Sequence, residues 1–177
     1  METKSGMDNT INVEDNFLSE EEHISVLDYC LDAKYTYGEY DRPELTPTGM
    51  ISEISETEYV YHLFRKKIKP FTEGLELDRM YINLFSPSER PYFHTDSGVH
   101  SDITFLYYPN DIWNLDDGGA TEFYIDGNFV GVAPLPNRLL YFNADIPHRA
   151  TTFRSRYRFT LAVKYTDPNG LINPTDC

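Results

Sequence analysis

The hydrophobic pattern of the chain changes its period once, near residue 75. Before that point apolar residues recur at helical spacing in two segments, and after it they alternate as in strands. The sequence Ser-Glu-Glu-Glu at 19–22 has the form of a capping box, and the pattern that follows predicts an amphipathic helix to about Ala33. A second such box, Ser-Glu-Thr-Glu at 55–58, predicts the start of a helix that stops near Pro70.

The rest of the N-terminal half predicts less regular structure. Residues 1–12 are polar and aperiodic and are expected to be a flexible tail, and residues 13–18 could form a short strand. Residues 35–54 are rich in Pro, Gly and Thr, which is typical of a long loop. Because long ordered loops are often functional, this loop and the loop at 97–101 are either lids over a substrate or simple insertions.

The C-terminal half predicts many short strands. The candidates are 78–86, 91–95, 101–108, 120–125, 128–134, 137–143, 148–153 and 156–165. Asp126-Gly127 is a strong hairpin turn signal between two of them. Strands in this number after two helices predict a mainly β (α+β) fold, a double-stranded β-helix or jelly roll supported by the helices.

Length and composition place these elements in one domain. With 177 residues, a single core is expected within 13–166, divided into helical support (13–75) and a β core (76–166), with a tail at 167–177. The formal net charge of -14 argues against a nucleic-acid binder, which needs a clustered basic surface. Two cysteines cannot form a disulfide framework, and neither a signal peptide nor a membrane span is predicted, so a cytoplasmic location is expected.

The strongest candidate for chemistry is a set of three residues. His94-Thr95-Asp96 is followed 52 residues later by His148. Two imidazoles and one carboxylate can occupy one face of a ferrous ion and leave positions for an organic acid and dioxygen. In an extended segment the side chains of residues i and i+2 point to the same side, so His94 and Asp96 can reach one metal. A His-x-Asp triplet alone is weak evidence, but here each part lies at the end of a predicted strand.

An arginine cluster follows this set in an otherwise acidic chain. The five arginines between 138 and 158 are either a solvated strand face or a local positive field for an anionic cosubstrate. Arg156 and Arg158 lie just beyond His148, and a planar guanidinium is well suited to binding the far carboxylate of a dicarboxylic acid.

Several stretches in the segment 81–165 resemble the catalytic core of Fe(II)/2-oxoglutarate dioxygenases of the prolyl 4-hydroxylase type. They come in the family's order, and they are His-Thr-Asp at 94–96, Ile-Thr-Phe-Leu-Tyr-Tyr-Pro-Asn at 103–110, Gly-Gly at 118–119, Asn-Arg-Leu-Leu-Tyr-Phe at 137–142, Pro-His at 147–148 and Arg-Tyr-Arg-Phe-Thr-Leu at 156–161. The N-terminal half resembles the family only in its general layout.

The resemblance implies a role for each matching residue. His94, Asp96 and His148 match the iron ligands, and Arg156 matches the basic residue that binds the distal carboxylate of 2-oxoglutarate. Tyr108 matches a tyrosine that hydrogen-bonds the same carboxylate, and Thr160 matches a threonine that faces the cosubstrate. Arg158 is the alternative to Arg156, since both are expected on one strand face; the Arg-Tyr-x-x-Thr pattern favours Arg156. Phe85 stands where the family often has a tyrosine, and Tyr81 could supply the missing polar contact.

The implied reaction converts 2-oxoglutarate and O2 to succinate and CO2 while hydroxylating an unactivated C–H bond, with ascorbate as a candidate reductant. The resemblance favours a prolyl residue in a peptide or protein as substrate, and a free amino acid or another small molecule is the alternative. Two other classes stay open: a non-catalytic jelly-roll binding module and a zinc-dependent hydrolase. The first should have lost metal ligands, and the second would not need Arg156, Tyr108 and Thr160 together.

Overall fold

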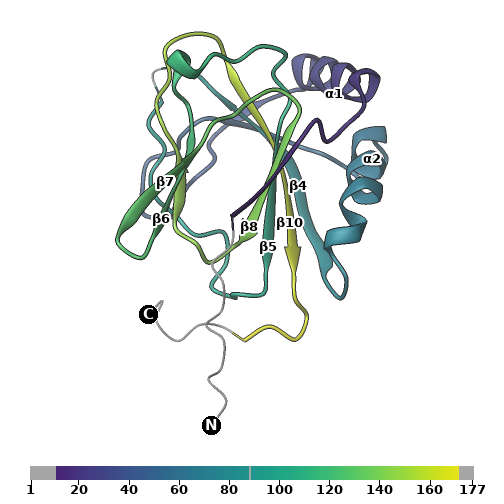
Figure 1. Cartoon of the computed structure of the whole chain (residues 1–177), viewed down its shortest axis with the longest axis vertical. Helices are drawn as coiled ribbons and strands as arrows, with labels where there is room; N and C mark the ends of the chain where they lie inside the picture. Colours follow the sequence, from purple (N-terminus) through teal and green to yellow (C-terminus); the bar gives the residue numbers. More distant parts are fainter. Residues whose placement is uncertain (1–10, 88, 172–177) are drawn as a thin grey trace.

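The computed structural model describes residues 11–87 and 89–171, which form two antiparallel sheets and two helices (Figure 1). The helices are α1 (Glu20–Asp32) and α2 (Tyr59–Ile68), and the strands are β1 (Ile11–Asp15), β2 (Thr36–Tyr37), β3 (Met50–Glu53), β4 (Glu76–Phe85), β5 (Ile103–Tyr108), β6 (Thr121–Ile125), β7 (Asn128–Val132), β8 (Arg138–Asn143), β9 (His148–Ala150) and β10 (Arg158–Thr166). The large sheet has the order β1-β8-β5-β10-β4-β3-β2, and the small sheet has the order β7-β6-β9. The predicted mainly β jelly roll is confirmed.

Strand β10 shows how the sequence divides the large sheet into two faces. Its alternate residues Phe159, Leu161, Val163 and Tyr165 belong to the core that contains the buried residues of both helices. Since successive strand residues point to opposite faces, Arg158, Thr160, Ala162 and Lys164 point into the space between the sheets. Figure 1 shows α1 and α2 together on the side of the large sheet away from β6 and β7.

The space between the sheets is partly filled by a second apolar cluster. It combines residues of the large sheet, among them Leu106, Leu140 and Ala162, with Phe123 of β6. Polar side chains replace apolar ones toward one end of the same space, where Thr121, His148, Arg158 and Thr160 are all buried. Buried polar groups need partners, so this end of the barrel is where a binding site can form.

Most predicted elements lie where the pattern placed them, but several predictions are wrong. Residues 91–95 form no strand; they contribute one isolated bridge at His94. The long loop 35–54 contains β2 and β3, which extend the large sheet at its edge. The residues Ser-Glu-Thr-Glu at 55–58 form a turn before α2, which begins at Tyr59. Half of the predicted box is present, since the Ser55 N–H donates to Glu58 Oε2 at 2.7 Å, but the Ser55 hydroxyl bonds Thr57 Oγ1 and caps no backbone N–H of the helix. The box at 19–22 caps α1 as predicted.

Described residues within both expected tails make defined contacts. Ile11 and Asn12 already pair with β8, while residues 1–10 lie outside the described residues. At the other end the Asp167 backbone N–H donates to Asp102 Oδ1 at 2.7 Å, and residues 172–177 lie outside the described residues. In the described part of the chain, neither helix is long and apolar enough to cross a membrane.

Candidate functional site

Two histidines far apart in the sequence are joined through their backbones. The His94 N–H donates to the His148 carbonyl at 3.1 Å, and the His148 N–H donates to the His94 carbonyl at 2.9 Å. This is the hydrogen-bonded pair of an antiparallel ladder, in which directly opposite side chains lie on the same side. Their imidazole ring centroids are therefore only 4.5 Å apart.

Asp96 completes a group of three potential metal ligands. Its backbone N–H donates to the Ala144 carbonyl at 2.8 Å, which fixes the segment beside the histidines. The Asp96 carboxylate oxygens lie 3.6 Å from Nε2 of His94 and 3.6 Å from Nε2 of His148. One ligand atom from each of the three residues lies within 4.8 Å of the others. Among the described residues this is the one such group of His, Cys, Asp and Glu.

Both histidines present Nε2 to the centre of this group because Nδ1 is held elsewhere. The Nδ1 atom of His148 lies 2.9 Å from the Ile146 carbonyl oxygen, and Nδ1 of His94 lies 3.0 Å from the Tyr92 carbonyl oxygen. A carbonyl oxygen can only accept, so Nδ1 carries the proton in each ring and Nε2 keeps its lone pair. Such second contacts fix the tautomer and orientation of metal-ligating histidines.

Burial favours a neutral His148, and the groups around the Asp96 carboxylate favour its ionised form. Burial lowers the pKa of His148 to about 4, so its imidazole is uncharged at neutral pH. Burial alone would raise the pKa of Asp96, but the Lys164 ammonium, the Thr104 hydroxyl and, in acid where its ring is protonated, His148 outweigh this effect and hold the pKa of Asp96 well below its usual range. Lys164 Nζ lies 2.9 Å from Asp96 Oδ1, and the Thr104 hydroxyl donates to Oδ2 at 2.6 Å. Both protonation states are those that a divalent cation requires.

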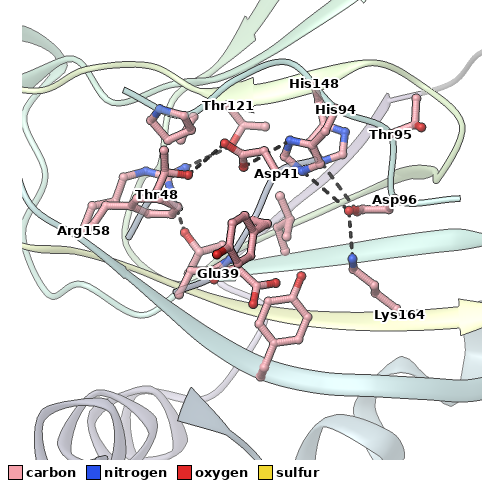
Figure 2. A pocket seen from close by; sticks show the side chains of 18 of the residues that line it. Glu39, Asp41, Thr48, His94, Thr95, Asp96, Thr121, His148, Arg158 and Lys164 are labelled. Carbon is pink, nitrogen blue, oxygen red and sulfur yellow. Dashed lines mark hydrogen bonds and ion pairs between the residues drawn. The ribbon is translucent and has the colours of Figure 1, made fainter. Parts of the chain in front are cut away.

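The three residues line a cavity of about 220 Å³ between the sheets (Figure 2). Arg158 and Thr160 of β10 line it, as does Thr121 of β6. The inward-facing residues of β4, namely Tyr81, Asn83 and Phe85, contribute a wall, and the loop before β3 contributes Glu39, Tyr40, Asp41 and Thr48. Loop 97–101, the second expected lid, contributes no residue to this lining.

Arg158 is a fully buried cation whose hydrogen bonds go to neutral groups. Its Nε donates to the Gly119 carbonyl at 3.0 Å, and its Nη atoms donate to the hydroxyls of Thr160 at 2.8 Å and Thr121 at 3.0 Å. Its guanidinium also lies 5.4 Å from the centre of the Tyr108 ring. Within the described residues no carboxylate pairs with it. A buried guanidinium surrounded by neutral dipoles is suited to an anionic ligand.

The structure places Arg156 away from the cavity. Arg156 precedes β10, has a positive φ of 63°, is exposed, and donates from Nη1 to the Ile112 carbonyl at 3.0 Å. The expectation that Arg156 and Arg158 share a strand face is therefore wrong, because the strand begins at Arg158. Thr160 stands two residues after Arg158 on the inward face, so the two form one contact surface.

The two candidate tyrosines differ in position. Tyr108 is buried behind Arg158, with its hydroxyl 2.7 Å from Thr121 Oγ1, and it does not line the cavity. Tyr81 does line the cavity, and burial raises its pKa to about 12, so it stays a neutral phenol. The ammonium of Lys164 lies 5.5 Å from the Tyr81 ring centre.

Sequence reasoning missed three contributors: Lys164, Thr121 and Asp41. Lys164 could have been found, since it lies an even number of residues after Arg158 and Thr160 in β10 and is therefore expected on the same strand face. Thr121 carries no comparable signal, and Asp41 lies in a loop whose path no local pattern predicts.

Comparisons with known proteins agree with this geometry. A sequence model of the 2OG-Fe(II) oxygenase superfamily matches residues 80–165, which contain all three potential metal ligands. No curated protein sequence matches the chain.

Solved structures extend the likeness to nearly the whole chain. A prolyl-4-hydroxylase from Pseudomonas putida is 18% identical with a TM-score of 0.71, over 92% of this chain and 95% of that one. A prolyl hydroxylase from Trichoplax adhaerens, in complex with a hypoxia inducible factor peptide fragment, is 19% identical with a TM-score of 0.71. The match covers 90% of this chain and 84% of that one. HygX from Streptomyces hygroscopicus, with nickel and 2-oxoglutarate bound, is 12% identical with a TM-score of 0.71, over 92% and 85%. At these identities the likeness is one of fold.

The buried His148 should make the stability of the metal-free protein depend on pH. Its pKa falls from 6.5 to about 4 on folding, so between these values the unfolded chain binds the proton more readily. The free energy of unfolding is then at its full value above about pH 6.5 and falls as the pH drops toward 4. At ~1.36 kcal/mol per pKa unit, the fall is about 3 kcal/mol. Urea unfolding in the presence of a chelator, repeated across this pH range, measures how steeply the free energy of unfolding depends on pH. The His148→Asn variant should show a smaller slope. Equal slopes for both proteins would contradict this account.

Lys164 should stabilise the metal-free protein by compensating the charge of Asp96. Lys164→Met leaves that carboxylate with one hydroxyl donor, and loss of one partner of a buried pair costs on the order of 3 kcal/mol. A bound divalent cation would replace the missing charge, so Mn(II) should raise the melting temperature of the variant more than that of the native chain. Lys67→Met is the control, because its bridge to Glu22 is about a third exposed. An unchanged stability of Lys164→Met in chelator would refute the prediction.

Proposed function

From the premise that residues 80–165 make this chain a 2OG-Fe(II) oxygenase, we propose that His94, Asp96 and His148 hold its ferrous ion and that Arg158 holds 2-oxoglutarate. The proposal rests on two features of one cavity: a group of three potential metal ligands, and a buried cation that pairs with no carboxylate of the described residues. Either feature alone would support a metal site or an anion site only.

The donor set fits a ferrous ion. Two imidazole nitrogens and one carboxylate are ligands that leave positions for other molecules, which is typical of non-haem iron oxygenases. His148 is neutral and Asp96 ionised in the folded protein, so neither must lose a proton to bind the metal. The contacts of both Nδ1 atoms to backbone carbonyls hold the rings ready for coordination.

The surroundings of Arg158 fit the distal carboxylate of 2-oxoglutarate. The guanidinium is held by Gly119, Thr121 and Thr160, so its orientation is fixed before any ligand enters. The Thr121 and Thr160 hydroxyls already accept from Arg158 and can themselves donate toward an anion. Tyr108 contributes indirectly, by supporting Thr121 and the guanidinium from behind.

When bound, the ferrous ion and 2-oxoglutarate supply the oxidising chemistry, in which 2-oxoglutarate and O2 become succinate and CO2 and a substrate C–H becomes C–OH. The chain itself binds and orients these components. His94, Asp96 and His148 fix the metal position at one part of the cavity, and Arg158 fixes the far end of the organic acid. Two parts of the cavity lining limit the access of water: the wall of β4 residues Tyr81, Asn83 and Phe85, and the loop with Glu39 and Asp41.

For the substrate, we propose a prolyl residue in a peptide or protein. Two prolyl hydroxylases share the fold over 90% or more of this chain, and one of them was solved with a peptide. The net charge of -14 further suits a peptide segment with basic residues. HygX, which was solved with hygromycin B bound, and the epimerase SnoN from nogalamycin biosynthesis share the fold, so a small-molecule substrate is the alternative.

Arg158→Gln and Arg156→Gln together decide which arginine binds the cosubstrate. Under anaerobic conditions, 2-oxoglutarate added to the protein with Fe(II) should produce a weak visible charge-transfer band whose titration gives the dissociation constant. Because a charge-assisted hydrogen bond contributes about 1.5–3 kcal/mol, Arg158→Gln should weaken 2-oxoglutarate binding roughly 10- to 100-fold. Arg156→Gln should bind as the native protein does, and His94→Ala should lose the band. A native protein without any band would sink the oxygenase site as assigned.

A peptide library tests the substrate. Peptides with one proline between basic residues should gain one oxygen atom by mass spectrometry, with succinate formed in equal amount and only when 2-oxoglutarate is present. The same peptides with acidic flanks should react more slowly because the protein is strongly acidic. If free proline or another small molecule is hydroxylated while every peptide stays unchanged, the prolyl-residue proposal is wrong and the small-molecule alternative holds.

A further inference from the structure

The cavity is covered on one side by the segment 38–49, which lies between two glycines of positive φ. Gly38 has a φ of 133° and Gly49 a φ of 74°. A Cβ at Gly49 would meet the Phe85 ring at 2.7 Å, so the end of the segment is held tightly against β4. Within it, Glu39, Tyr40, Asp41 and Thr48 line the cavity; Glu39, Asp41 and Thr48 are labelled in Figure 2.

One side chain of this segment reaches the group of three potential metal ligands. The Asp41 side chain is only 8% exposed, and its Oδ1 lies 3.4 Å from Nδ1 of His94. Its other oxygen, Oδ2, accepts hydrogen bonds from the Tyr92 backbone N–H at 2.8 Å and from the Thr48 hydroxyl at 2.8 Å. One carboxylate therefore joins the covering segment, the backbone before His94 and the ring of His94.

Asp41 acts on His94 by two routes. The Nδ1 proton of His94 points to the Tyr92 carbonyl at 3.0 Å, and Asp41 Oδ1 lies beside the same N–H. Asp41 also holds the Tyr92 peptide by its N–H, so it fixes the residue whose carbonyl orients the ring. A carboxylate next to the outer N–H of a ligating histidine fixes the ring and makes the metal-binding nitrogen more basic.

We propose that Asp41 is a positioning residue for His94, and that it couples the order of segment 38–49 to metal binding. This inference rests on the proposed function, since it assumes that His94 binds the metal. A metal at Nε2 withdraws charge from the ring and strengthens the hydrogen bond that Nδ1 donates. Coupling between two sites is reciprocal. If the contact between Asp41 and His94 raises the affinity for the metal, then binding of the metal must stabilise that contact, and with it the covering segment, by the same free energy.

The remaining contacts of the segment do not involve His94. Glu39 pairs with Arg79 of β4 at 3.2 Å, and the Thr48 N–H donates to the Glu39 carbonyl at 2.9 Å. Arg79 also packs over the Tyr81 ring at 4.2 Å. These contacts hold the base of the segment, so loss of Asp41 should loosen the tip near residues 40–47 and leave the fold intact.

The experiment compares Asp41→Ala and Asp41→Asn with Glu44→Gln. Glu44 is an acidic residue of the same segment whose side chain is 64% exposed and pairs with Arg42, so its variant removes the same charge without touching His94. Mn(II), a redox-stable divalent cation, is titrated by calorimetry into each metal-free protein, and amide hydrogen exchange of residues 38–49 is followed with and without Mn(II).

The expected result is a 10- to 100-fold weaker Mn(II) affinity for Asp41→Ala, a smaller loss for Asp41→Asn, and none for Glu44→Gln. Mn(II) should slow amide exchange in 38–49 of the native protein and have little effect there in Asp41→Ala. Native affinity in both Asp41 variants, next to normal binding by the native chain, overturns the inference and leaves the proposed function standing. Failure of the native chain to bind Mn(II) at all overturns the proposed function and the inference with it.

Discussion

The backbone pair between His94 and His148 is the constraint on which the site depends. Two hydrogen bonds of 2.9 and 3.1 Å join segments that are more than fifty residues apart in sequence, and they fix which way both imidazoles point. Asp96 takes its position from the same region, because its N–H is held by Ala144 just before β9. A metal would therefore enter a group whose backbone is already set, and little ordering remains to oppose its binding.

The charges inside the barrel follow a simple scheme. Asp96 pairs with the Lys164 ammonium and Glu39 with the Arg79 guanidinium. Asp41 instead accepts from the Tyr92 N–H and the Thr48 hydroxyl and lies beside His94. Arg158 is the buried cation of this region that has no carboxylate partner among the described residues, since its guanidinium contacts hydroxyls, a carbonyl and an aromatic ring. Burying a cation in this way is unfavourable unless an anion joins it, which is the physical reason for proposing an organic acid as the ligand of Arg158.

The sequence predicted the architecture and the metal group better than the details around them. Apolar and polar residues alternate over 78–86, 101–108 and 137–143 because one face of each strand is buried. This alternation can be recognised in the sequence without knowing which other strands are neighbours. The expectation that Arg156 and Arg158 share a strand face failed because β10 begins at Arg158, and Arg156, with its positive φ, lies two residues before the strand. Local patterns do not reveal where a strand begins to within two residues. Asp41 was beyond prediction, since its contacts to Tyr92 and His94 arise only when a segment of irregular backbone folds over the cavity.

The position of β10 has a consequence for how the protein is made. This strand lies between β4 and β5 in the middle of the large sheet, although it is the last strand along the described chain. During synthesis both helices and β4 must therefore leave the ribosome long before their central neighbour exists, and their apolar faces stay unsatisfied until then. Such non-local pairing is typical of slow folding and of nascent chains that aggregate. The protein should depend on chaperones during translation more than a helical chain of the same length does.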